Sequence, residues 1–453
     1  MTPAAPVPDC ADDPLWPAPR RAWYVAIVLM LANTCAFVDR QALALVVQPI
    51  QNDLGASDTQ MGLLYGLGFT LLYLGLGIPL ARVADRSSRT WIVTGAILWW
   101  SAATAACGFA RSFTALFAAR LAVGAGEAGL SPAAYSLLSD YFPRHRLAAA
   151  MGVYQMGIYV GGGLALVIGG ALSTVVPPDA TFQLPLAGAM RGWQLLFVLL
   201  GIPGLFLAAL MLSVREPHRR GPAVAVPLVT LRAVLAHIGS RPRAYFGIGF
   251  GFALMVFVGN ATGAWIPTLL SREYGWSTSE IGVRYGLVVF GCGTVGALSG
   301  GFASTFFERR SGHHGSILTA LIGFSAMVPL SVAFPLVGEA GVALALIGVM
   351  NFFAGFSFGG GHATLQHLTP NRMRARTSAL YLLLINIFGG IFGPTTVALM
   401  TDYWFADPDR LPEAIALICS IASPLALLFL VIGMSGLRDA APTLRSRPFF
   451  QDK

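Results

Sequence analysis

Long apolar runs separated by short polar breaks dominate the pattern of this chain. Stretches of about 18 or more apolar residues indicate spanning helices, because about 20 helical residues cross a hydrocarbon core of roughly 30 Å. The runs are too long for the alternating strands, about ten residues each, of a membrane barrel, and helices pair their own backbone groups. The pattern predicts an all-α integral membrane protein with twelve spanning helices. We expect these spans at Trp23 to Ile50, Thr59 to Ala81, Thr90 to Ala110, Phe113 to Asp140, Leu147 to Leu172, Gly192 to Val214, Ala244 to Leu270, Thr278 to Thr305, Gly315 to Leu336, Gly341 to Leu368, Thr377 to Thr401 and Glu413 to Gly436.

The longest polar break divides the chain into two six-helix halves, residues 1–214 and residues 244–453. This break, residues 215–243, is expected to be a cytoplasmic linker. Apolar residues within it recur at helical spacing: Leu228, Leu231, Val234, Leu235 and Ile238. The spacing fits a short amphipathic helix on the membrane surface, and a linker that is merely structured fits it equally well.

The two halves repeat one another at an offset of 220 residues. The segment LGASDTQMGLLYG, residues 54–66, aligns without a gap on YGWSTSEIGVRYG, residues 274–286. The identical positions pair Gly55 with Gly275, Ser57 with Ser277, Gly62 with Gly282, Tyr65 with Tyr285 and Gly66 with Gly286. Repeats in the same orientation predict a pseudo-two-fold axis along the membrane normal, a binding cavity between the halves, and alternating access by rocking one half on the other.

Composition agrees with this picture, since 55% of the 453 residues are hydrophobic, 11% are charged and the mean hydropathy is +0.68. If both ends are cytoplasmic, 22 of the 29 arginine and lysine residues fall on the inner side, four on the outer side and three within spans. This asymmetry predicts a multi-pass protein of a cell inner membrane or plasma membrane with both termini in the cytoplasm. The membrane surface explains the net charge of +8, so nucleic acid is not an expected partner.

Several kinds of chemistry are not expected from this sequence. The only lysine is Lys453, so a phosphate-binding loop that ends in lysine is impossible, and we expect no enzyme. The five cysteines are scattered without the spacing of metal ligands, so neither a metal site nor a disulfide framework is expected. No cofactor is expected either, and we expect a monomer. The first span should target the chain, because the first twenty residues lack the pattern of a cleavable signal peptide.

Polar stripes on two spans hold the strongest candidates for a functional site. One face of the first span carries Asn33, Phe37, Arg40 and Gln41. Asp39 lies about 100° round the helix from Arg40, at the edge of this stripe, where it can face a neighbouring helix.

The fourth span carries a second stripe of Arg120, Gly124, Glu127, Ser131 and Tyr135. Arg120 and Glu127 lie about two turns apart on one face, and the glycine between them leaves room for a partner helix.

The stripes lie at similar depth, so we infer one cluster of four residues: Asp39, Arg40, Arg120 and Glu127. An isolated charge at the bilayer centre costs at least about 2.5 kcal/mol, which makes pairing nearly obligatory. Desolvation and nearby arginines shift the pKa of a carboxyl in opposite directions, and both effects change when a cavity opens to either side of the membrane. The cluster either couples transport to protons through Glu127 or Asp39, or it forms a permanent salt-bridge staple between two spans.

The second half has no acid deep inside a span, and its deep polar residues are close to neutral. Its candidates for contact with a substrate are Asn260, Asn351, Phe358 and His362. His362 by itself is more often a satisfied interior histidine than a proton carrier. This asymmetry predicts proton chemistry in the first half and a hydrogen-bonding, apolar surface for substrate in the second.

Three segments carry a resemblance to the major facilitator superfamily over essentially the whole chain. The family's loop signature resembles ARVADRSSRT, residues 81–90. Its fourth-span motif resembles RLAVGAGEAG, residues 120–129, and its glycine-rich fifth span resembles GIYVGGGLALVIGG, residues 157–170. Ala81 and Ser88 depart from the glycines usual in the loop. The resemblance implies a twelve-helix transporter with a cytoplasmic gate at Asp85, Arg86 and Arg89, and proton loading by Glu127 or Asp39.

Within the superfamily, the segment from Phe37 to Leu64 together with GEAGLSPAAYSLLSDYFP, residues 126–143, resembles the spinster branch. That resemblance implies lipid-like substrates, of the lysophospholipid or sphingosine-phosphate type. Carriers of small organic anions and sugar acids also show an aspartate-arginine pair in the first span, so they are the main alternative, with drug efflux as another. Aromatic candidates to line a cavity for lipid are Phe37, Phe69, Tyr73, Tyr135, Phe257, Trp265 and Phe358.

Overall fold

The computed structural model describes residues 16–184, 188–219, 230–311, 315–370 and 373–445. In this part of the chain, twelve helical segments are long and apolar enough to cross a membrane, which confirms the predicted fold class. The first half contains α1 (Pro19–Leu45), α2 (Val47–Leu54), α3 (Asp58–Tyr65), α4 (Leu67–Arg86), α5 (Arg89–Cys107), α6 (Phe113–Glu127), α7 (Leu130–Tyr141), α8 (Arg144–Val175), β1 (Thr181–Leu184), β2 (Gly188–Arg191) and α9 (Gly192–Leu212). The remainder contains α10 (Leu231–Gly239), α11 (Pro242–Tyr274), α12 (Thr278–Glu280), η2 (Ile281–Tyr285), α13 (Gly286–Ser311), α14 (Gly315–Ala333), η4 (Phe334–Leu336), α15 (Ala340–Leu368), α16 (Arg374–Ile385), η5 (Asn386–Phe392), α17 (Gly393–Leu399), η6 (Met400–Phe405), η7 (Pro408–Arg410) and α18 (Leu411–Arg445).

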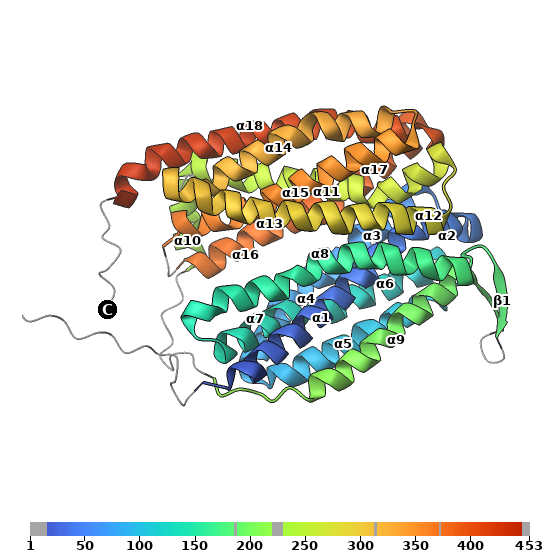
Figure 1. Ribbon diagram of the computed structural model, residues 1–453, viewed down its shortest axis with the longest axis horizontal. Helices are drawn as coiled ribbons and strands as arrows, with labels where there is room; N and C mark the ends of the chain where they lie inside the picture. Colours follow the sequence, from blue (N-terminus) through green and yellow to red (C-terminus); the bar gives the residue numbers. More distant parts are fainter. Residues whose placement is uncertain (1–15, 185–187, 220–229, 312–314, 371–372, 446–453) are drawn as a thin grey trace, which may run out of the picture.

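The helices form two bundles that lie side by side, the first half in blue to green and the second in yellow to red (Figure 1). Within the first half, α1 packs along α8 and α5 along α9. Within the second half, α11 packs along α18 and α13 along α15. The beginning of α1 and the end of α18 lie at the same end of the molecule, which we call the proximal end (Figure 1). The β-hairpin marks the opposite, distal end.

The predicted repeat is visible in the local structure at the distal end. Gly55 and Gly275 both adopt the left-handed conformation, with φ of 63° and 64°, and each ends a helix. Glycine suits this position because it has no Cβ to clash. Two residues later, Ser57 and Ser277 both cap the next helix in a reciprocal capping box. Equivalent residues therefore build equivalent turns in the two halves.

The spans that contact the opposite half are irregular. The second span breaks between α3 and α4 at Gly66, where ψ is −79°. At the equivalent point in the second half, η2 is a π-helix that ends just before Gly286. The eleventh span contains two further π-helices, η5 and η6. Such segments are rare and frequently occur at functional sites, and here η2 packs on α8 while η5 packs on α4.

Main-chain atoms of the two halves meet closely along two seams at the distal end. In the first seam, α3 lies against the eleventh span: a Cβ added at Gly62 would lie 2.8 Å from the Ala398 side chain, and one at Gly66 2.6 Å from the Ile391 carbonyl oxygen. In the second seam, α8 lies against η2, and a Cβ added at Gly170 would lie 2.6 Å from a backbone atom of Gly282. Small residues let helix backbones approach in this way.

The linker contains a short helix, α10, where the apolar spacing leaves an amphipathic helix and a merely structured segment both open. Thr230 caps α10, Val234 is buried, and Leu231 and Leu235 are exposed on one face. The His237 ring packs edge-on against Tyr245, with 5.7 Å between the ring centroids. Leu228 lies outside the described residues. The position of α10 at a membrane surface stays a prediction.

A two-stranded hairpin between the fifth and sixth spans was not predicted. β1 pairs antiparallel with β2, with Phe182 opposite Met190. Arg191 at its end donates to Asp53 at 2.9 Å, and the Trp193 indole donates to the same carboxylate at 3.0 Å. The carboxylate of Asp53 therefore fixes the hairpin to the distal end of the first half.

Candidate functional site

The centre of the first half holds an ion pair between α1 and α6. The Arg40 Nε and Nη2 atoms both donate to Oε2 of Glu127, at 2.7 and 2.5 Å. The Glu127 side chain is 0% exposed, whereas the Arg40 side chain is 26% exposed. The pair therefore joins a fully enclosed acid to a guanidinium that reaches an accessible surface.

Aromatic rings surround the Arg40 guanidinium. Its central carbon lies 4.2 Å from the centroid of the Phe69 ring, 4.8 Å from that of Phe37 and 5.0 Å from that of Tyr73. A cation over an aromatic face is stabilised by the ring quadrupole, by about 0.5–2 kcal/mol depending on its hydration. The rings from α1 and α4 therefore hold the positive charge beside Glu127 in partly apolar surroundings.

Asp39 points away from this ion pair, toward α5. Its Oδ2 atom accepts a hydrogen bond from the Thr104 hydroxyl at 3.2 Å. Arg120 Nη1 donates to the backbone carbonyl of Asp39, also at 3.2 Å, and not to its carboxylate. The four residues of the predicted cluster thus lie together, but as one ion pair, one carboxyl bonded to a hydroxyl, and one arginine on a backbone oxygen.

Three buried atoms of the cluster have no hydrogen-bond partner in the described part of the chain. They are Asp39 Oδ1, Arg120 Nε and Glu127 Oε1. Buried polar groups are normally satisfied, and exceptions concentrate where a site changes its protonation or binds a ligand. The cluster is therefore less saturated than a purely structural network.

Gly124 brings α4 against the cluster. A Cβ at this position would collide with the carbonyl oxygen of Phe69, so α4 and α6 touch through backbone atoms. This close approach places the Phe69 ring over Arg40, and it agrees with the expectation that the glycine leaves room for a partner helix.

A second polar group lies beside the cluster, around Tyr154 on α8. Asn33 donates to the Tyr154 carbonyl oxygen at 3.0 Å, and the Ser131 and Tyr154 hydroxyls lie 3.2 Å apart. The exposed Tyr135 ring packs edge-on against the Tyr154 ring at 5.4 Å. Tyr154 was not among the predicted site residues, although a second alignment of the two halves, at an offset of 227 residues, pairs it with Tyr381.

For the other candidates for substrate contact, the structure gives only the exposure of a side chain or a contact within one helix. Gln41 is half-buried on α1, and Asn260 is exposed on α11. The Asn351 amide donates to the Ile347 carbonyl of its own helix at 2.9 Å. The side chains of Phe358 and His362 lie outside the described part of the structure.

Two aromatic residues proposed to line a cavity are packed in the second half. Trp265 is fully buried and donates its indole N–H to the Pro394 carbonyl at 3.0 Å, and Phe257 is buried as well. The expectation that Trp265 lines a cavity was therefore wrong, because hydropathy alone does not separate core rings from cavity rings, and the same expectation for Phe257 stays a prediction.

At the proximal end, Arg89 is buried among residues of the first half and the linker. It pairs with Asp140 at the end of α7, and its Nε donates to Glu216 at 2.7 Å. The side chains of Asp85 and Arg86, the other two residues of the predicted gate, lie outside the described part of the structure. Arg89 therefore ties α5 to α7 and to the linker.

Glu216, which sequence analysis missed, caps the start of α5. It accepts from the backbone N–H and hydroxyl of Thr90 at 2.9 and 2.8 Å and from the Ser88 hydroxyl at 3.0 Å. Burial raises the pKa of the Glu216 carboxyl, but the bonds from Thr90, Arg89 and Ser88 outweigh it and lower this pKa to about 2. Glu216 is consequently ionised throughout the physiological pH range.

A further ion pair, also missed, links the halves at the distal end. Arg272 on α11 donates to both oxygens of Asp58 on α3, at 2.7 and 3.0 Å. The Asp58 side chain is 1% exposed and also accepts from Gln51 at 2.7 Å and Thr401 at 3.0 Å. We call these residues the distal lock. Its ion pair joins two ordinary charges near span ends, Arg272 and Asp58, that are 214 residues apart, so no local pattern revealed it.

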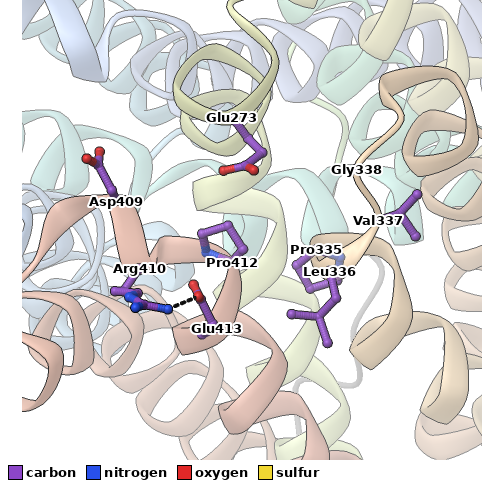
Figure 2. A pocket seen from close by; sticks show the side chains of 9 residues that line it. All are labelled: Glu273, Pro335, Leu336, Val337, Gly338, Asp409, Arg410, Pro412 and Glu413. Atoms are coloured by element: carbon purple, nitrogen blue, oxygen red, sulfur yellow. Dashed lines mark hydrogen bonds and ion pairs between the residues drawn. The ribbon is translucent and has the colours of Figure 1, made fainter.

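A pocket of about 370 Å³ opens at the distal end of the second half (Figure 2). Glu273, residues 335–338 and residues 409–413 contribute its lining, and Arg410 pairs with Glu413 at 2.6 Å. It is built from ends of the second half, whereas the ion cluster lies in the first. Among the described residues, no group of three or more His, Cys, Asp or Glu side chains is placed to hold a metal ion.

Two repeated six-helix halves, a buried ion pair at the centre of one of them and an inter-half lock at one end define a multi-pass membrane transporter. The comparison of sequences agrees, since residues 29–394 match the Major Facilitator Superfamily. The chain belongs to this family, whose fold is that of a transporter and not of an enzyme.

Three similar proteins show where this chain falls within the superfamily. The chain matches a crystal structure of a bacterial homologue to the human lysosomal transporter Spinster, in an inward-facing and unoccupied conformation, with 28% identity, a TM-score of 0.78, and 96% of this chain and 100% of that chain covered. It is 30% identical over 386 residues to an MFS-type efflux pump of Mycolicibacterium smegmatis, covering 85% of each. It is 24% identical over 393 residues to a hexuronate transporter of Bacillus subtilis, covering 83% and 87%. The resemblance to the spinster branch is confirmed, and the names of these three relatives differ: one names efflux, one hexuronate and one Spinster.

Proposed function

We propose that this protein is a proton-coupled secondary transporter that works by alternating access, with Glu127 or Asp39 exchanging the proton. The observation that carries the proposal is the bond between the enclosed Glu127 carboxylate and the partly exposed Arg40 guanidinium. When Glu127 takes up a proton, Arg40 loses its counter-charge, and an anionic group of the substrate replaces it. Proton and anion then favour each other's binding, by the reciprocity that governs coupled sites.

The distal end faces outward in this proposal. The positive-inside pattern supports it, because it assigns both termini to the cytoplasm. The distal seams and the distal lock then close the outer side, as expected for an inward-facing state, and a solved structure similar to this chain is inward-facing. Asp85 and Arg86 would form the inner gate in the opposite state, while Arg89 holds their loop in place.

The substrate class we favour is an amphipathic lipid of the lysophospholipid or sphingosine-phosphate type. Arg40 offers a positive charge flanked by the rings of Phe37, Phe69 and Tyr73, which suits a charged head beside an apolar chain. The second half contributes the neutral Asn260 and Asn351 as expected contacts and no deep acid. The similarity to a Spinster homologue supports the same class. A monomer in a plasma membrane or cell inner membrane is sufficient for this activity.

A small organic anion or sugar acid is the second candidate substrate. Its support is the 24% identity to a hexuronate transporter, together with an arginine that suits a carboxylate as well as a phosphate. Drug efflux is a third candidate, supported by the 30% identity to an efflux pump.

Reconstitution into liposomes with an imposed pH gradient tests the proposal. A fluorescent lysophospholipid and radiolabelled glucuronate serve as the two probes. We expect gradient-driven flux of the lysophospholipid in the wild type and its loss in Glu127→Gln, with downhill exchange retained. Glu280→Gln is the matched control, because this exposed acid pairs only weakly with Arg284, at 3.6 Å.

The possible results of this reconstitution separate the coupling residue, the substrate class and proton coupling itself. Gradient-driven flux that survives in Glu127→Gln would reject Glu127 as the coupling residue and leave Asp39, and survival in the double variant Glu127→Gln, Asp39→Asn would favour the permanent staple. Flux of glucuronate without flux of the lipid would replace the substrate class and leave the coupling intact. Wild-type flux that ignores the pH gradient would reject proton coupling altogether.

A further inference from the structure

Adjacent residues on α1 meet very different surroundings. Arg40 is partly exposed and bonds Glu127, whereas Asp39 is 1% exposed and faces α5. A proton that enters from an accessible surface therefore meets the Arg40 and Glu127 pair first. The environment of Asp39 is fixed by protein groups alone.

The only described side chain that hydrogen-bonds the Asp39 carboxylate is that of Thr104. Threonines inside helices commonly donate to a carbonyl one turn earlier on their own helix. Thr94 on the same helix does so, with its hydroxyl 2.9 Å from the Thr90 carbonyl, and Thr262 and Thr319 follow the same pattern. The Thr104 hydroxyl instead donates across to α1, and the residue is 0% exposed.

Several charged or titratable groups face Asp39 from the helices around it. They are Cys35 and Arg40 on α1, Cys107 on α5, and Arg120 and Glu127 on α6. Two of them, Arg120 and Glu127, carry opposite charges, and Arg120 is committed to the Asp39 backbone carbonyl. Thr104 thus adds a directed hydrogen bond to a set of largely opposing charge interactions.

We infer that Thr104 is a positioning residue for proton coupling, whose hydroxyl sets the pH at which Asp39 loads its proton. The hydroxyl donates to the ionised carboxylate, and it must turn or break this bond when Oδ2 carries a proton. A donor to the charged form favours that form, so its removal lets Asp39 take up a proton at higher pH. This inference rests on the proposed function, because it concerns the regulation of the same coupling site.

The first test compares the pH profile of gradient-driven flux in Thr104→Val and in the wild type. Valine keeps the shape and removes the hydroxyl, and we expect the midpoint to move upward by about one pH unit. Thr104→Ser should restore the wild-type midpoint. Thr94→Val is the matched control, since its hydroxyl serves only its own helix, and its midpoint should not move.

The second test does not depend on transport. Infrared titration of the protonated carboxyl band in reconstituted Glu127→Gln protein, minus the same titration of Glu127→Gln, Asp39→Asn, isolates the contribution of Asp39. The band should titrate at higher pH in Thr104→Val, and Thr104→Ala serves as a second variant should the valine protein fail to fold. Equal titration with and without the hydroxyl overturns the inference. A shifted titration in a protein whose flux ignores the pH gradient rejects the proposed function, and with it the role of Thr104 in coupling, while the effect of the hydroxyl on Asp39 stands.

Discussion

Breaking the distal lock should open the distal end of the transporter. The change we consider is Arg272→Gln, which removes the charge paired with Asp58 and keeps a polar side chain of similar length. Asp58 would keep its bonds from Gln51 and Thr401, but an uncompensated carboxylate would remain buried between the halves. Separation of the halves would let water reach this carboxylate, so the variant should favour the state that is open at the distal end.

The size of the effect follows from the burial of Asp58. Removal of one partner from a buried ion pair costs about 3–5 kcal/mol. Because two neutral donors remain on Asp58, we expect the lower end, about 3 kcal/mol, which is on the order of a 150-fold change in the equilibrium constant between the two states. The double variant Asp58→Asn, Arg272→Gln should recover much of the closure, because it leaves no buried charge.

Distances between spin labels on the two halves measure this change. Labels at Phe109 and Leu336 suit the purpose, since both are exposed at distal ends, one in each half. The distance distribution should lengthen in Arg272→Gln. Arg284→Gln is the control, because Arg284 and Glu280 form an exposed pair worth at most about 1 kcal/mol, and its distribution should match the wild type. A distribution that is unchanged in Arg272→Gln would refute the distal lock.

Three further predictions concern single positions. Gly124→Ala should lower the melting temperature in detergent, since overpacking against the Phe69 carbonyl costs about 1–3 kcal/mol, whereas Gly162→Ala, with open space around its Cβ, should not. Glu216→Gln should destabilise the protein by about 1–2 kcal/mol, a value reduced to allow for the exposure of this side chain. Because folding lowers the pKa of Glu216 from about 4.5 to about 2, this stabilisation is present above about pH 4.5 and lost below it, so the melting difference should be equal at pH 5 and pH 8. If the melting difference between the wild type and Glu216→Gln disappears between pH 5 and pH 8, the pKa of Glu216 is not lowered as stated. Tyr73→Leu should weaken substrate binding two- to fivefold by removing one ring from Arg40, as measured by the concentration for half-maximal flux.

The architecture was predictable because hydropathy reports lipid contact directly. In the described part of the chain, each of the twelve apolar runs contains a helix long and apolar enough to cross a membrane, and the 220-residue repeat anticipated matching turns at Gly55 and Gly275. The π-helices η2, η5 and η6 were not predictable, since a π-turn alters the hydrogen-bond register without leaving a periodic mark in the sequence. The β-hairpin was missed because four-residue strands carry too little pattern.

The site was predictable where charge is rare and not elsewhere. Arg40 and Glu127 stood out because a charge inside a span must find a partner. Thr104 did not stand out, since a threonine in an apolar helix usually satisfies itself on its own backbone. Glu216 and Asp58 were missed because acids near span ends are common, and only the folded chain shows what they bind.

Closure of the distal end depends on backbone contacts at glycine residues. Glycines such as Gly62 and Gly170 bring backbone against the opposite half, so the spacing at closure is fixed by peptide geometry and not by the bulk of any side chain. Residues that contact the substrate can therefore be substituted without changing how closely the two halves approach at the distal end. We therefore expect substitutions at the substrate-contacting residues and substitutions at the seams of this chain to act separately, the first on substrate choice and the second on closure.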